Sequence, residues 1–190
     1  MNKRILSTMA LASVVALGVA CDKKKDEPAT TQTTSATPAA PAPLSDHDKE
    51  FLTKAAQGGM LEVAEGQAIA AKAPNTAVKT FGQEMVTDHS KANDELKALA
   101  ASKGATLPTQ LDSDHQKKLD KLTKKNGPKL DKYYASDMVD DHEEDVKEFK
   151  DAAKNLDDPD LRAWADKTLP TLEHHLMMAR DLKAQTKNEK

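Results

Sequence analysis

Four long stretches of this chain repeat apolar and small residues at the spacing of a helix, and this pattern constrains the fold most. The stretches cover about residues 45–73, 76–103, 128–157 and 159–187. Residues three, four and seven positions apart share one face of a helix, so each stretch predicts a helix with one apolar face. A composition with 31% charged and only 3% aromatic residues also favours helices over a sheet. We therefore predict an all-α fold, a four-helix bundle over residues 44–187.

Residues typical of helix ends separate the four predicted helices. Capping residues or prolines open the first, third and fourth helices, whereas a proline–asparagine pair and a glycine end the first and second. These residues are Ser45, Pro74–Asn75, Gly104, Pro128 and Asp158–Pro159. Inside the fourth helix, Pro170 removes one backbone hydrogen bond, so we expect a bend there.

A long connector, residues 105–127, joins the second and third predicted helices and carries a short helix near residues 114–124. A helix of ~28 residues spans ~42 Å, and a connector that is partly helical and partly extended can cover that length. A simple up-down-up-down bundle needs only a short loop at this point. The length therefore favours a crossover that runs these two helices parallel, as ferritin-like folds do.

The first 21 residues resemble an export signal. Lys3 and Arg4 precede an apolar run, residues 5–20, that is short for a membrane span and has the flanks of a signal peptide. The run ends at Cys21, the one cysteine of the chain, and resembles the lipobox of bacterial lipoproteins, in which that cysteine is acylated. Gly18 departs from the lipobox pattern, so ordinary cleavage after residue 20 is the alternative.

We predict that residues 21–43 are a lipidated cysteine followed by a disordered tether. The tether is expected because the stretch after the cysteine is rich in Lys, Asp, Thr, Ala and Pro and lacks apolar periodicity. We expect the domain to lie in the cell envelope, facing the periplasm, and to contact the membrane through the lipid anchor. Asp22 resembles a signal for the inner membrane, but the choice between inner and outer membrane stays open. The chain has a net charge of −3, and affinity for nucleic acid comes largely from Lys and Arg bound to phosphates. We therefore do not expect this protein to bind nucleic acid.

An internal repeat marks the second and third helices. Residues 85–89 read Met-Val-Thr-Asp-His, and residues 138–142 read Met-Val-Asp-Asp-His. His89 and His142 each lie four residues after a methionine of the apolar face, so both share that face. Asp88 and Asp141 precede them by one residue, about 100° round the helix, at the border of the face.

The outer helices each add one polar residue on the apolar face, Glu62 and His175. Glu62, His89, His142 and His175 fall at similar depths along a bundle, and this set could bind a transition metal such as Zn, Fe, Cu or Mn. The alternative is a hydrogen-bonded polar layer that sets the helix register, with Asp88 and Asp141 orienting the imidazoles. The two Glu-x-x-His motifs of di-iron bundles are absent from the sequence, which makes a two-metal oxidase site doubtful.

Residues 51–182 resemble the bacterial domain-of-unknown-function family 4142, whose members are often labelled outer-membrane proteins. The resemblance rests on residues 55–63 (AAQGGMLEV), the two Met-Val-x-Asp-His segments, and Leu169-Pro170-Thr171-Leu172 followed by His175. It implies a ferritin-like four-helix bundle in the cell envelope. It implies no settled activity.

Three classes of function remain open. The sequence favours a non-enzymatic envelope module that binds a partner or serves in stress tolerance, with the protein partner and the oligomeric state undefined. The first alternative is a metal-binding or metal-handling protein that uses the inward Glu/His set. The second alternative is a ferritin-like oxidoreductase, which the low number of inward carboxylates disfavours.

Overall fold

The computed structural model describes residues 43–188, and five helices and no strand occur in that range. Four of the helices are long and one is short, as the spacing of apolar residues predicted. Their bounds are α1 Asp46–Lys72, α2 Thr76–Ser102, α3 Ser113–Thr123, α4 Pro128–Asn155 and α5 Pro159–Thr186. The predicted all-α bundle is confirmed, and the helix ends agree with the sequence within a few residues.

Side chains of the predicted end residues cap the helices. Ser45 Oγ accepts from the backbone N–H of Asp48, and Asp48 accepts from the backbone N–H of Ser45, a reciprocal capping box. Asn75 and Asp158 accept the first free N–H groups of α2 and α5. Gly127, at φ +60°, precedes the proline that opens α4. Local chemistry therefore explains where these helices begin.

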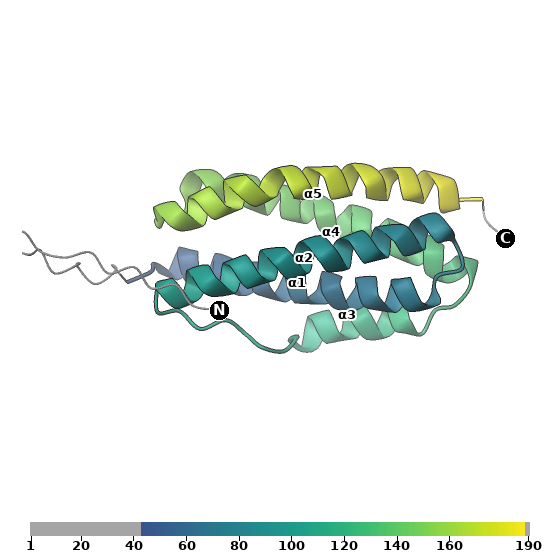
Figure 1. Ribbon diagram of the computed structural model, residues 1–190, viewed down its shortest axis with the longest axis horizontal. Coiled ribbons are helices and arrows are strands. Elements are labelled where there is room, and N and C mark those ends of the chain that lie inside the picture. Colours follow the sequence, from purple (N-terminus) through teal and green to yellow (C-terminus); the bar gives the residue numbers. More distant parts are fainter. Residues whose placement is uncertain (1–42, 189–190) are drawn as a thin grey trace, which may run out of the picture. The chain divides into compact units, whose positions relative to one another are not determined.

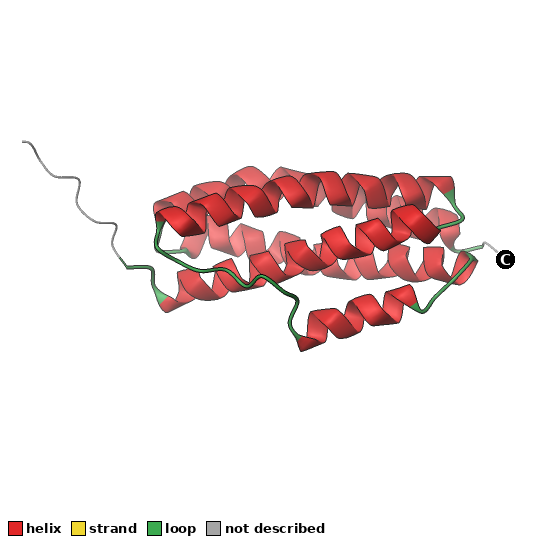
Figure 2. Cartoon of the chain, turned by 60° about the horizontal axis from the view of Figure 1, so that its bottom comes forward, coloured by secondary structure: helices red, strands yellow, loops and turns green. Residues whose placement is uncertain are grey.

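The long connector runs along the bundle and places α2 and α4 parallel (Figure 1). At one end Lys72 Nζ, on the last residue of α1, donates to the carbonyl of Thr123, close before α4 begins. At the other end Asp48, in the first turn of α1, accepts from the backbone N–H of Asp157, just after α4 ends. Helix α4 is therefore antiparallel to α1 and parallel to α2. The expected crossover is confirmed, and α3 lies outside the four long helices (Figure 2).

The helices pack as two antiparallel pairs, α1 with α2 and α4 with α5. The first pair is close at two glycines: a Cβ atom on Gly66 would lie 2.6 Å from the backbone oxygen of Gly82. Toward one end of the bundle, the rings of Phe51, Phe149 and Trp164 pack against one another. Between the apolar regions lies a layer of buried polar groups, which contains the candidate site.

Helix α5 continues past Pro170 to Thr186 without a break, and the bend expected at that proline stays a prediction. The expected signal peptide, the acylated Cys21 and the tether lie outside the described residues. Within residues 43–188, no helix combines the length and the apolar character that a membrane crossing requires.

Candidate metal centre

Each long helix contributes one of the four predicted residues, and all four are buried. Glu62 on α1 is 3% exposed and His89 on α2 is 6% exposed, whereas His142 on α4 and His175 on α5 are fully covered. The apolar residues around them on each helix face force the polar groups inward. The structure therefore brings together the set that the spacing indicated.

The three imidazoles face one another in the middle of the bundle. The ring centroids lie 5.8 Å apart for His89 and His142, 5.2 Å for His89 and His175, and 5.4 Å for His142 and His175. Each ring has a nitrogen that lies within 4.8 Å of a nitrogen in each of the other two rings, and these three atoms form one mutual cluster. Three helices thus place three possible ligand atoms around one point.

One nitrogen of each ring contacts an oxygen that can accept its hydrogen. His89 Nδ1 lies 2.8 Å from Glu62 Oε2, His175 Nε2 lies 3.0 Å from Asp88 Oδ2, and His142 Nδ1 lies 3.0 Å from the carbonyl of Met138. We assign the ring hydrogen to these nitrogens, since a neutral imidazole has one donor and one acceptor.

The other nitrogen of each ring then carries a lone pair. These atoms are His89 Nε2, His142 Nε2 and His175 Nδ1, which are buried and have no hydrogen-bond partner among the described residues. This arrangement, with one nitrogen anchored by an oxygen and the other free, is typical of metal-ligating histidines.

Burial keeps the imidazoles neutral. Desolvation lowers the pKa of His89 to about 4 and that of His142 to about 3, and it also lowers the pKa of His175. The neighbouring imidazoles lower the pKa of His142 further. All three rings are therefore uncharged at neutral pH, which is the form that binds a metal ion.

Glu62 connects the imidazoles to the carboxyl groups of α4. Its Oε1 lies 3.5 Å from His142 Nε2. Burial, and then the charge of Asp141, raises the pKa of Glu62 to about 8, and burial raises the pKa of the neighbouring Asp145 well above its usual value. Because both pKa values are raised, this pair of carboxyl groups retains a proton at neutral pH.

The two aspartates of the repeat have different partners. Asp88 orients an imidazole, but it contacts His175 of α5 and not the adjacent His89. Asp141 lies 2.5 Å from Lys118 Nζ of α3 and makes no hydrogen bond to an imidazole among the described residues. Each aspartate is rotated by about 100° from the histidine that follows it, so it points to a neighbouring helix.

Two further acidic residues of this region were not predicted. Glu65 is fully buried, and neither carboxyl oxygen has a hydrogen-bond partner within the described part of the chain. Burial and the nearby carboxyls of Asp137 and Asp141 raise the pKa of Glu65 to about 9. Asp145 contacts Glu62, and burial raises its pKa well above the usual value. Their positions, three after Glu62 and three after His142, are the signal that could have identified them.

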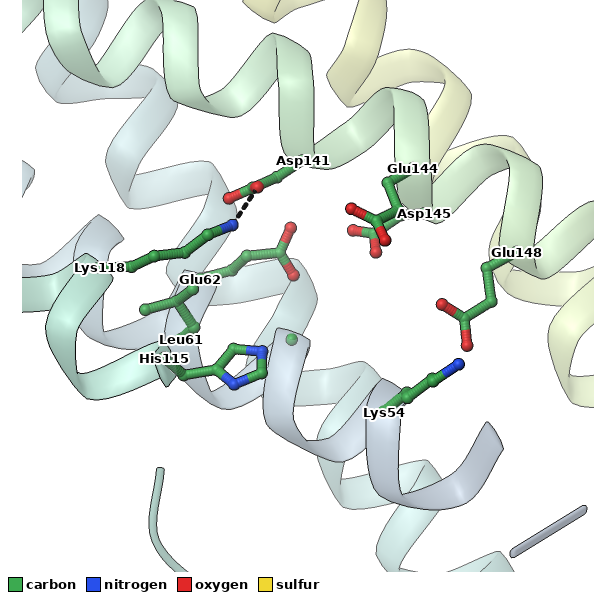
Figure 3. Close-up of a pocket in the computed structure, with 10 residues that line it drawn as sticks. Lys54, Leu61, Glu62, His115, Lys118, Asp141, Glu144, Asp145 and Glu148 are labelled. Carbon is green, nitrogen blue, oxygen red and sulfur yellow. Dashed lines mark hydrogen bonds and ion pairs between the residues drawn. The ribbon is translucent and has the colours of Figure 1, made fainter. Parts of the chain in front are cut away.

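A cavity of about 260 Å³ opens beside the site, between α1 and α4. Figure 3 shows the Glu62 carboxyl pointing toward Asp141 and Asp145 of α4, with Lys118 of α3 on one side. A smaller cavity of about 30 Å³ is lined by Glu62, His89 and Trp164 among others. That volume is enough for a water molecule.

The family model described as a domain of unknown function (DUF4142) matches residues 33–182. The chain belongs to this family. The resemblance expected from the two Met-Val-x-Asp-His segments is thereby confirmed, and the histidines and Glu62 all fall inside the matched DUF4142 region.

A solved structure shares the fold of this DUF4142 chain. It is described as the crystal structure of a DUF305 fragment from Deinococcus radiodurans, and it superposes with a TM-score of 0.66. The two are 9% identical, and the match covers 76% of this chain and 99% of the other. At this identity the likeness concerns the fold alone. No curated protein sequence matches the chain.

Proposed function

We propose that this domain binds one transition-metal ion through His89, His142 and His175. The observation that carries the proposal is the pairing at each ring, where one nitrogen meets an oxygen acceptor and the other is buried without a partner. A cation bound by these three nitrogens would give each of them a partner.

Energetics favour a cation over a purely structural layer. A buried polar atom without a partner costs about 1–3 kcal/mol, and this cost applies to each of the three ring nitrogens. A hydrogen-bonded layer would need a donor for each of them, but none makes a hydrogen bond within the described residues, and Glu62 Oε1 can serve only His142, at 3.5 Å from Nε2. A metal ion bound to all three nitrogens would remove these costs.

The ligand chemistry suggests Zn²⁺ or Cu²⁺, since neutral imidazole suits these borderline ions. The 3.5 Å between Glu62 Oε1 and His142 Nε2 is close to the ~3.3 Å between two ligands of a tetrahedral site with bonds of ~2.0–2.1 Å. Glu62 or a water molecule in the small cavity would take the fourth position. All four long helices contribute a side chain to this site. We therefore favour metal binding or handling over the more general function of an envelope module that binds a partner.

We further propose that the domain performs this function in the cell envelope, held to a membrane by acylated Cys21. The support for this location is the basic start, the apolar run and the cysteine within residues 1–21. Such a tether would expose the site to metal ions of the periplasm.

Metal analysis tests the binding proposal directly. Untagged protein is stripped with a chelator and titrated separately with Zn²⁺ and Cu²⁺, and bound metal is measured by mass spectrometry. We expect one ion per chain, and loss of that ion in the His89→Ala/His142→Ala double variant. His174→Ala is the matched control, because that imidazole is exposed beside His175. Full occupancy in the double variant would refute the site, and no bound ion in the wild type would favour the structural layer.

A further inference from the structure

The larger cavity reaches one ligand group of the buried site. Ten residues line it, of which five carry carboxyl groups and two carry ammonium groups. Glu62 is among them, although its side chain is 96% buried, and its Oε1 has no hydrogen-bond partner within residues 43–188. Figure 3 shows this carboxyl directed at the space between α1 and α4. The cavity therefore extends from the α3 side of the bundle to the edge of the imidazole cluster.

His142 belongs to two sets of possible ligands at the inner edge of this cavity. One set is His142 with His89 and His175, and the other is His142 with Glu62 and Asp145. Its Nδ1 is engaged by the carbonyl of Met138, so only Nε2 can bind a cation. A single nitrogen binds one ion at a time. The two sets are therefore alternative positions for one ion and not two sites filled together.

We propose that the cavity between α1 and α4 is the entry port for the metal ion, and that Glu62 and Asp145 bind the ion before the three histidines do. This inference rests on the proposed function. Among the cavity residues, Glu144 and Glu148 lie on the same helix as Asp145, and Figure 3 shows their carboxyls toward the same opening. An excess of carboxyl groups at the opening attracts divalent cations and raises their local concentration.

Two variants change the port in different ways. Asp145→Asn removes one carboxyl group, and with it one anionic ligand, from the outer ligand set and keeps the side-chain shape. Gly58→Leu narrows the opening without removing a polar group, because a Cβ atom on Gly58 would have no neighbouring atom within 4 Å. The leucine also suits a helix better than glycine, so this variant should fold. Glu143→Gln is the matched control, since Glu143 is exposed, pairs with Arg180 and does not line the cavity.

The rates of metal loading and release provide the test. Co²⁺ is mixed with the full chain in a stopped-flow instrument, and binding is followed by quenching of Trp164, the only tryptophan, which lines the small cavity beside His89. We expect association and release both to slow by about tenfold in Asp145→Asn and in Gly58→Leu, because the ion passes the same port in each direction. The control should keep the wild-type rates.

The outcomes separate this inference from the proposed function. A wild type that binds no Co²⁺ would overturn both. Wild-type rates in both port variants, with one ion still bound, would overturn the port alone. Faster release of Co²⁺ from Asp145→Asn at an unchanged association rate would also overturn it, since Asp145 would then only strengthen binding.

Discussion

Glu62 Oε2 lies 2.8 Å from His89 Nδ1, and both side chains are more than nine-tenths buried. This contact joins α1 to α2 in the middle of the bundle and sets the orientation of the His89 ring. The other ring nitrogen, Nε2, is buried without a hydrogen-bond partner among the described residues. Glu62 therefore orients an atom of another helix that we propose as a metal ligand.

Removal of this carboxyl should weaken metal binding. We expect Glu62→Ala to reduce the affinity for Zn²⁺ by about 10–100-fold, as loss of an orienting partner does. Glu62→Gln should lose less, because its amide oxygen still accepts from His89 Nδ1. Competition with a coloured chelator measures both affinities. Equal affinities in Glu62→Ala and the wild type would show that the contact does not orient a ligand.

The stability of the metal-free protein should fall as the pH rises from 7 to 9. The pKa of Glu62, at about 8, and of Glu65, at about 9, lie far above the unfolded value near 4.5, so the folded state binds more protons in this range. Stability then decreases with rising pH, by ~1 kcal/mol per pH unit for each retained proton. Urea unfolding in the presence of a chelator measures the slope.

A glutamine at position 65 isolates one of these protons. A glutamine side chain cannot ionise, so the stability of Glu65→Gln should decrease less steeply with rising pH than that of the wild type. The two slopes should differ by the contribution of about one bound proton, ~1 kcal/mol per pH unit. Glu143→Gln, an exposed site on α4, should keep the wild-type slope. A Glu65→Gln slope equal to that of the wild type would mean that Glu65 is already ionised at pH 7.

The close contact of α1 and α2 should not accept a methyl group at Gly66. The added Cβ would lie 2.6 Å from the Gly82 oxygen and 2.9 Å from Val86 Cγ2, so the helices would have to move apart. We expect Gly66→Ala to lose about 1–3 kcal/mol of unfolding free energy. Gly58→Ala meets no atom within 4 Å and should gain up to about 1 kcal/mol through helix propensity. Thermal unfolding compares the two, and equal stabilities would contradict the close packing.

The lipid anchor is tested by Cys21→Ser. We expect the wild type to incorporate a labelled fatty acid and to fractionate with membranes, whereas the variant should lose the label and become soluble. In the proposed anchor the thiol would be the acylated group, so serine could not replace it. Absence of label in the wild type would instead indicate ordinary cleavage after residue 20.

The sequence by itself determined the helices and the residues that face inward. Capping side chains such as Ser45 and Asp158 act within a few residues, so helix ends can be read from local spacing. The same applies to His89 and His142, whose distance from apolar neighbours places them on the buried face. The length of the connector, which can cover a helix, also favoured the crossover.

Only the tertiary structure decided which groups meet. Spacing along a helix tells which face a residue occupies, but not which neighbouring helix lies opposite or at what height. For this reason Asp88 contacts His175 and not His89, and Asp141 pairs with Lys118. The buried Glu65 and the Glu62–Asp145 contact depend in the same way on how closely α1 and α4 approach. These contacts arise between helices, where the packing of the whole bundle sets each distance.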